Sequence, residues 1–329
     1  MSDAALYFTA PETVEIRPIT VGPPDPSELL VETNVSAVSA GTELLVYHDE
    51  TPSDVRADET IDALDEEFSY PIRYGYAACG VVRAVGSDVD SEWVGRSVFS
   101  FTPHQTRFHA DPESVVVVPD GTTAETGALV PSMETATNLV LDAAPRLGER
   151  VVVHGAGVIG LCVVRLLSSF PLSELVVVDP VERRRSLARG LGADRAVTPE
   201  ALSEAVADVD LAIELSGEPA ALDDAIDVVG YDARIVVGSW YGTKRAELDL
   251  GGRFHRDRID VVSSQVSTIS PELRGRWDRE RRFDTALDWL GRLDVETLIT
   301  HRIPFERAEE AYELLDGDPN AAVQVVLEY

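Results

Sequence analysis

The chain has 329 residues, of which 44% are hydrophobic, and 58 acidic residues against 28 basic ones give a formal charge of −30. This length exceeds what one compact core holds, so two domains are expected. A surface this anionic repels nucleic acid and acidic lipid, which argues against both as partners. The most apolar run, residues 151–167, is broken by glycines and is shorter than the ~20 residues of a membrane span.

The kind of charge is also unusual, because Lys244 is the only lysine and arginine supplies the remaining basic residues. Acid excess with scarce lysine indicates halophilic adaptation, since concentrated salt screens the self-repulsion of such a surface. A cationic partner is the less favoured alternative, because the acids are dispersed along the chain. No basic, apolar signal peptide is recognised at the N-terminus, and Cys79 and Cys162 lie in apolar contexts. A cytoplasmic protein without disulfides is therefore expected.

Three regions differ in their pattern of apolar residues. Residues 1–121 contain short apolar runs separated by turn signals, which predict a β-rich unit. Residues 122–265 alternate predicted strands and helices, which is typical of a parallel sheet covered by helices. Residues 266–329 contain a charged helix, a second helix and a terminal strand. The fold class predicted is α/β, and the strands expected from residue 150 onward are 150–154, 175–178, 211–215, 234–237 and 323–327.

A glycine motif joins the first strand of the middle region to the helix that follows it. Residues 155–160 read G-A-G-V-I-G, which fits G-x-G-x-x-G. In this motif the first glycine permits the tight turn, the second lets a pyrophosphate approach, and the third lets the helix pack on the strand. The helix N-terminus also favours phosphate. The predicted cofactor-binding loop is Gly155, Ala156, Gly157, Val158, Ile159 and Gly160.

An acid at the end of the next predicted strand strengthens the interpretation. Asp179 lies nineteen residues after Gly160, where a carboxylate can accept hydrogen bonds from the adenosine ribose. It would repel a 2′-phosphate, so NAD is favoured over NADP. The arginines at 183–185 could instead accept that phosphate, although a solvated helix face is the preferred interpretation. Ser216 and Gly238 complete the predicted cofactor-binding residues, and Asp179 is expected at a solvent-open strand end.

With this motif placed, the chain resembles the medium-chain dehydrogenase/reductase superfamily over essentially its whole length. The S-A-G-T-E form of residues 39–43, with 254–256 and 263–265, is similar to the bacteriochlorophyllide-dehydrogenase-like branch. The resemblance implies a GroES-like β-barrel catalytic domain at 1–121, a central Rossmann domain at 122–265 and a C-terminal segment, 266–329, that rejoins the first. We also expect a small-molecule substrate and a homodimer. The segments that carry the resemblance are 35–43, which looks like the family's first catalytic strand and loop, and 75–80, 298–302 and 309–312.

The chain departs from the zinc-dependent members where their ligands would stand. Ala40, Tyr76 and Pro131 occupy the places of a cysteine, a histidine and a third ligand, and the lobe of four cysteines is missing. Zinc needs about four N, S or O ligands, so no zinc is expected. His104, His109 and Glu134 have no spacing that is typical of a metal site.

Without zinc, a hydrogen-bond donor has to stabilise the substrate oxygen during hydride transfer. By resemblance, Thr42 stands where the family has a hydroxyl that contacts the substrate alcohol. Tyr76 either acts as a general acid or base or fills the vacated zinc cavity. Glu43 is expected to orient its neighbours. The predicted function is zinc-independent hydride transfer between nicotinamide and an alcohol or carbonyl; the alternatives are an enone or quinone reductase and a silent nicotinamide-binding protein.

Overall fold

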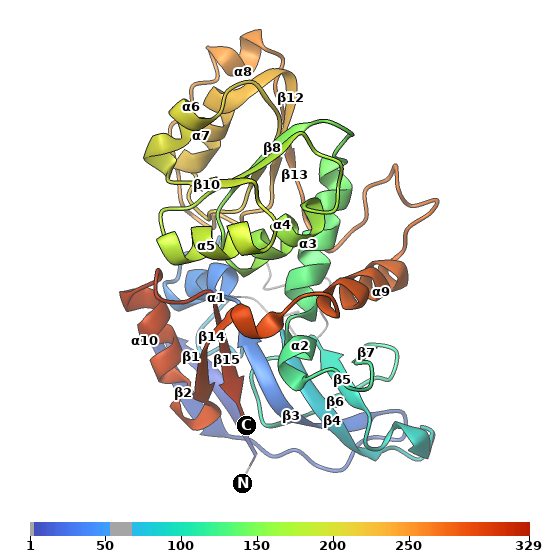
Figure 1. The fold of residues 1–329 in the computed structure, drawn as a ribbon. Helices are drawn as coiled ribbons and strands as arrows, with labels where there is room; N and C mark the ends of the chain where they lie inside the picture. Colours follow the sequence, from blue (N-terminus) through green and yellow to red (C-terminus); the bar gives the residue numbers. More distant parts are fainter. Residues whose placement is uncertain (1–2, 53–67) are drawn as a thin grey trace. The chain divides into compact units, whose positions relative to one another are not determined.

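A computed structural model describes residues 3–52 and 68–329 of the protein (Figure 1). The chain forms two compact units, one containing residues 1–131 and 294–329 and the other residues 132–293. They are called unit 1 and unit 2 below, and each is described by itself. Within the described ranges, no helix has the length and apolar character needed to cross a membrane.

Unit 1 is built on antiparallel strands. Its main sheet has the order β14-β15-β3-β4-β5-β7, and β6 also pairs with β3. A second sheet pairs β1 (Ala4–Ala10) with β2 (Thr13–Pro18). The strands of the main sheet are β3 (Leu29–Val38), β4 (Ala78–Val85), β5 (Ser97–Ser100), β6 (Arg107–Ala110), β7 (Val116–Val117), β14 (Ile299–Pro304) and β15 (Gln324–Glu328).

The C-terminal segment is an integral part of unit 1. Strand β15 pairs antiparallel with β3, and β14 then pairs parallel with β15. Helix α10 buries Ala311, Tyr312 and Leu315 in the same apolar cluster as Leu6 and Phe8 of β1. The helices of this unit are α1 (Ala40–Tyr47), α2 (Ala124–Ala128) and α10 (Glu309–Gly317), with single turns η2 (Ser91–Trp93), η4 (Val295–Thr297) and η5 (Phe305–Arg307).

Unit 2 contains a six-stranded parallel sheet in the order β10-β9-β8-β11-β12-β13. The chain starts in the middle, proceeds to one edge, and then returns to fill the other half, which is the doubly wound order of a Rossmann domain. The α/β fold predicted from the alternating pattern is confirmed. The strands are β8 (Arg150–His154), β9 (Glu174–Val178), β10 (Arg195–Val197), β11 (Val209–Glu214), β12 (Val229–Val237) and β13 (Asp260–Ser263).

Helices cover the apolar strands of unit 2. Helix α4 packs against β8 and β9, and α5 against β9 and β10, whereas α6, α7 and α8 contribute to a core with Val152, Ala212 and Ile235. Buried parallel strands are apolar on both faces, which explains the valine-rich sequence of β8 and β9. The helices are α3 (Val130–Ala143), α4 (Val158–Leu167), α5 (Glu182–Gly190), α6 (Leu202–Ala205), α7 (Ala220–Val228), α8 (Arg253–Arg256) and α9 (Arg279–Leu290), with the single turn η3 (Pro199–Ala201).

The structure differs from the sequence interpretation in two respects. The units change at 131/132 and 293/294, whereas the sequence placed these changes at 121/122 and 265/266. Helix α9 belongs to unit 2, where its Arg282 bonds Glu134 of α3. The segment 39–43, interpreted as the end of a strand and a loop, instead enters helix α1, so Thr42 and Glu43 lie in its first turn.

Candidate active site

The glycine loop after β8 has the geometry that its sequence predicted. Gly155 has φ +91°, and a Cβ at this position would lie 2.5 Å from the carbonyl oxygen of Leu215. A Cβ on Gly160 would lie 2.0 Å from the carbonyl oxygen of Gly155. Both contacts are with backbone, which cannot move aside as a flexible side chain can. These two positions therefore require glycine for the turn and for the close packing of helix on strand.

Gly157 leaves the N-terminus of α4 open. It is the N-cap residue of the helix, and a Cβ there would meet no atom within 4 Å. The first-turn amides of Val158, Ile159 and Gly160 precede the start of intrahelical bonding. Open space, unpaired amides and the positive end of the helix dipole together suit a pyrophosphate. Residues 155–160 thus fit the dinucleotide that their motif implied.

Residues predicted from separate strands lie at the carboxyl edge of the same sheet. Ser216 follows β11, and Gly238 follows β12, where its N–H donates to the carbonyl oxygen of Glu214 at 3.0 Å. A Cβ on Gly238 would approach the side chains of Leu139 and Leu215 to 2.6 and 2.7 Å. Because the strand order reverses between β8 and β11, this edge is the topological switch point at which open α/β sheets bind ligands.

Asp179 lies at the end of β9, but its predicted exposure was wrong. The residue is 2% exposed, because its two carboxylate oxygens accept the backbone N–H groups of Ala156 and Val181, each at 2.8 Å. Arg184 Nη1 lies 3.9 Å from the same carboxylate. Arg183 is exposed. Asp179 therefore ties the glycine loop to the start of α5, a role that its sequence position did not reveal.

The sequence interpretation also missed a buried carboxylate at this edge. Glu214, the last residue of β11, is fully buried and accepts the N–H and hydroxyl of Ser216 and the phenol of Tyr241. Burial, with the adjacent Glu214, raises the pKa of the Tyr241 phenol. His154, the register partner of Glu214 on β8, is also buried, and burial lowers its pKa to about 4. The sequence around Glu214 does not indicate these contacts, because it is an apolar strand that ends in a single acidic residue.

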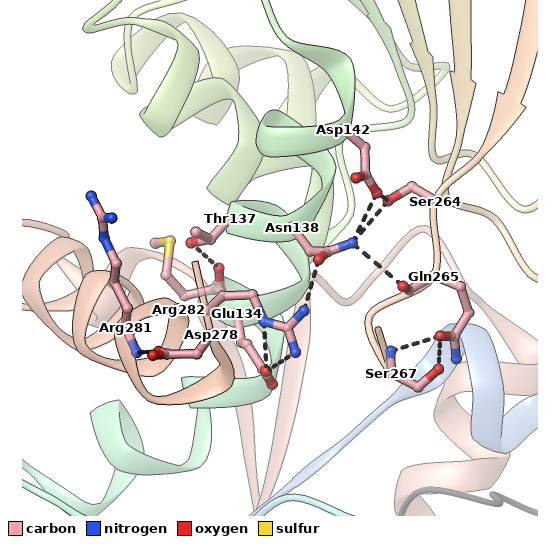
Figure 2. Close-up of polar contacts among 11 residues, drawn as sticks. Glu134, Thr137, Asn138, Asp142, Ser264, Gln265, Ser267, Asp278, Arg281 and Arg282 are labelled. Carbon is pink, nitrogen blue, oxygen red and sulfur yellow. Dashed lines mark hydrogen bonds and ion pairs between the residues drawn. The ribbon is translucent and has the colours of Figure 1, made fainter. Parts of the chain in front are cut away.

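A polar chain anchors the segment that leaves β13 (Figure 2). Asp142 of α3 accepts from Ser264 Oγ at 2.6 Å and from Asn138 Nδ2 at 3.0 Å. Asn138 Oδ1 accepts from Arg282 of α9 at 2.7 Å, and Arg282 bonds Glu134 at 2.7 and 3.0 Å. Burial raises the pKa of Asp142 and of Glu134. These side-chain contacts hold α3, α9 and the residue after β13 together.

In unit 1, the predicted catalytic hydroxyls lie together. The Tyr76 phenol donates to Thr42 Oγ1 at 3.3 Å and also bonds Ser39 Oγ. Tyr76 is partly exposed and packs edge-on against Tyr74. Ser39, which the sequence interpretation did not select, immediately precedes α1 and so completes a cluster of three hydroxyl groups. Such groups can donate hydrogen bonds to a substrate oxygen and can pass a proton between themselves.

Glu43 lies beneath this cluster and is fully buried. One carboxylate oxygen accepts the Ser39 N–H at 2.7 Å; the other accepts the Tyr312 phenol at 2.7 Å and lies 3.1 Å from His104 Nε2. Burial raises the pKa of Tyr312 well above its usual value, and the charge of Glu43 raises it further, so Tyr312 remains a donor. Glu43 therefore orients the backbone at the start of α1.

The residues present do not fit a catalytic zinc ion. Ala40 and Pro131 have no side-chain donor, and a neutral phenol such as Tyr76 is a poor zinc ligand. Over the ranges that the structure describes, no group of three or more His, Cys, Asp or Glu side chains could hold a metal. His104, His109 and Glu134 each bond a different partner: His104 bonds Glu43, His109 bonds the carbonyl oxygen of Gly22, and Glu134 bonds Arg282.

Comparisons with known proteins agree with this architecture. Residues 158–290 match a family model described as zinc-binding dehydrogenase. The chain is 26% identical over 272 residues to D-guloside 3-dehydrogenase of Escherichia coli K12, covering 76% of each chain. It is 24% identical to L-threonine 3-dehydrogenase of Pyrococcus furiosus over 98% of each chain. A crystal structure from E. coli CFT073, described as a short chain alcohol dehydrogenase with NADH, superposes with a TM-score of 0.80 over 100% of both chains at 20% identity.

Proposed function

We propose that this chain exchanges a hydride between NAD and an alcohol or carbonyl compound without catalytic zinc. It belongs to the medium-chain dehydrogenase/reductase superfamily, as an NAD(P)-dependent oxidoreductase. The observation that carries the zinc-free mechanism is the cluster of Ser39, Thr42 and Tyr76 hydroxyls, which includes a residue that stands in a ligand position. These groups offer donors where a metal-dependent relative would offer a Lewis acid.

Different residues of the chain have different roles in the proposed reaction. Residues 155–160 would hold the pyrophosphate of the cofactor, which when bound would supply or accept the hydride. Thr42 donates a hydrogen bond to the substrate oxygen as negative charge develops on it. Tyr76 gives its phenolic proton to that oxygen during reduction, or takes the proton during oxidation, with Ser39 as its hydrogen-bond partner. Glu43 holds the Ser39 backbone in place.

NAD is proposed over NADP because of Asp179. Each oxygen of a carboxylate has a second lone pair, so the bonds to Ala156 and Val181 leave acceptors for the ribose hydroxyls. Fluorescence titration should show NADH binding more tightly than NADPH, and Asp179→Asn should narrow the difference. Equal or reversed affinities would remove this role from Asp179 and assign the 2′-phosphate to Arg183, which is exposed at the start of α5.

The relatives favour an alcohol and its ketone as the substrate pair. D-Guloside and L-threonine, for which two relatives are named, are both hydroxyl compounds. NADH oxidation over a panel of ketones, aldehydes, enones and quinones, with NAD reduction over alcohols, tests this proposal. Turnover should be highest with an alcohol or ketone. Turnover restricted to enones or quinones would instead make the protein a double-bond or quinone reductase, and binding of NADH without turnover would make it catalytically silent.

A homodimer through β13 is proposed for the assembly. This strand is the edge of the six-stranded sheet and is exposed along its length, with Val261 40% and Val262 47% exposed. An apolar edge strand is a template for pairing, and a two-fold axis would pair it with a second copy of itself. Sedimentation should show a dimer that Val262→Lys converts to monomers. A wild-type monomer would contradict the proposal.

Halophilic behaviour is proposed from the charge of −30 and the single lysine. Salt shortens the distance over which the acidic groups repel one another. Thermal melts over a salt series should show a rising midpoint, and activity should be assayed in concentrated salt. A midpoint that stays constant or falls would remove the halophilic interpretation.

A further inference from the structure

His104 is buried at the point where the two hydroxyl-bearing segments of unit 1 meet. It is fully buried, and its Nε2 atom lies 3.1 Å from Glu43 Oε2 on α1. Its ring also lies directly against Gly75, where a Cβ would come within 2.4 Å of Cδ2 and of Nε2. Gly75 immediately precedes Tyr76 and has φ +94°. One imidazole therefore touches both the segment that carries Thr42 and the segment that carries Tyr76.

The other side of the ring is held as firmly. His104 Nδ1 lies 2.6 Å from Ser36 Oγ, which lies 2.9 Å from the phenol of Tyr329. Burial raises the pKa of Tyr329, so this phenol remains a donor. On the opposite side of the ring, Nε2 donates to Glu43, because a carboxylate can only accept.

The effect of the imidazole reaches the hydroxyl cluster through two short paths. Glu43 accepts the Ser39 N–H at 2.7 Å, and the Ser39 carbonyl oxygen in turn accepts the Thr42 N–H at 3.0 Å. On the second path, contact with Gly75 fixes the backbone from which the Tyr76 ring projects. Loss of the imidazole would remove one hydrogen-bond donor from Glu43 and would leave an unfilled space next to Gly75. Ser39, Thr42 and Tyr76 would then lose their common alignment.

We propose that His104 is a positioning residue, which sets the relative placement of Thr42 and Tyr76 for the oxidoreductase reaction by bonding Glu43 and packing on Gly75. The proposal rests on the proposed function, in which those two hydroxyls act on the substrate oxygen. If His104 only stabilised the core, its replacement would lower the free energy of unfolding without changing the kcat of the folded enzyme.

Two variants separate these roles. His104→Leu removes both ring nitrogens, whereas His104→Gln retains an amide N–H that can donate to Glu43. Misplacement of catalytic groups by about 1 Å can cost ~10²-fold in rate, so His104→Leu should lower kcat by about that factor. The Kd for NADH should not change, because the glycine loop belongs to unit 2. His104→Gln should recover most of the lost kcat. His109→Leu, which removes a histidine of β6 that bonds Gly22, is the matched control.

Amide hydrogen exchange supplies a readout that does not depend on turnover. In His104→Leu, the segments 39–47 and 74–78 should both exchange faster than in wild type, while His109→Leu should leave them unchanged. If wild type turns over no substrate, the proposed function fails, and exchange in these segments still decides whether His104 positions them. A folded His104→Leu with wild-type kcat, or with unchanged exchange in both segments, would overturn the proposal, as would His104→Gln being no better than His104→Leu.

Discussion

The two units each bury a carboxylate in a polar network, and the networks differ in the partners that they provide. Glu43 in unit 1 bonds a backbone amide, a phenol and an imidazole. Glu134 in unit 2 pairs with the guanidinium of Arg282 (Figure 2), and Arg282 is 3% exposed. One network supports hydroxyl groups that are partly exposed. The other joins two helices through a buried ion pair.

The difference shows that a buried glutamate can orient catalytic groups in one unit and hold two helices together in the other. A buried ion pair costs desolvation of both groups, and loss of one partner leaves the other charge uncompensated. Donors such as an imidazole, a phenol and an amide fix a carboxylate in direction without a permanent countercharge. Changes to the Glu134 network should therefore alter stability first, whereas changes around Glu43 and its hydroxyls should alter catalysis first.

The largest stability effect is expected at Arg282. Arg282→Met removes the guanidinium but keeps an apolar side chain of similar length, so Glu134 becomes an unpaired buried carboxylate. The free energy of unfolding should fall by about 3–5 kcal/mol, measured by urea denaturation at constant high salt. Arg281→Met, at the adjacent exposed position, is the control and should change little. A loss below about 1 kcal/mol would show that the pair does not hold α9 to α3.

The largest catalytic effect is expected at the hydroxyl cluster. Thr42→Val and Tyr76→Phe each remove one donor, and loss of such a donor typically raises the barrier by about 2.7–4 kcal/mol. We expect kcat to fall by about 10²–10³-fold while NADH affinity is unchanged. Tyr7→Phe, on β1 beneath the Arg17 guanidinium, is a matched control for loss of a phenol. If Tyr76→Phe has wild-type kcat, Tyr76 only fills the space of the missing ligand.

A smaller, pH-dependent effect is expected at Asp142. Burial raises its folded-state pKa above the ordinary 3.8, so the folded protein holds this proton more tightly than the unfolded chain. Protonated Asp142 therefore favours the folded state, and this contribution to stability is lost as pH rises through the folded-state pKa. Asp142→Asn lacks this loss, so its stability relative to wild type should increase from about pH 4 to about pH 7. Exposed Asp284→Asn is the control, and a relative stability that is flat or falling would contradict this expectation.

The cofactor loop could be predicted because its signal is local. A valine-rich strand, three glycines and an apolar helix are contiguous, and each glycine has a steric reason within that segment or its immediate neighbours. The doubly wound sheet followed from the alternation of strands and helices. The exposure of Asp179 could not be read in this way, because it depends on two amides that only the folded turn brings to the carboxylate.

The network of unit 1 could not be predicted because it is assembled from distant segments. Glu43 contacts His104, which lies 61 residues further along the chain, and Tyr312 of the C-terminal segment, which returns to unit 1 through β15. Nothing local distinguishes His104 from His109, although one is buried on Glu43 and the other bonds a surface carbonyl. The start of α1, in contrast, is closed by a local contact, since Glu43 accepts the N–H of Ser39 four residues before it.

Metal analysis combined with turnover on one sample tests the zinc-free mechanism most directly. Protein purified through a chelator in concentrated salt should contain well under one zinc per chain and should retain the kcat of untreated protein. That result is expected because Ala40, Tyr76 and Pro131 supply no conventional ligand set. Stoichiometric zinc in the untreated protein, with activity lost on its removal and restored when zinc is returned, would contradict the account.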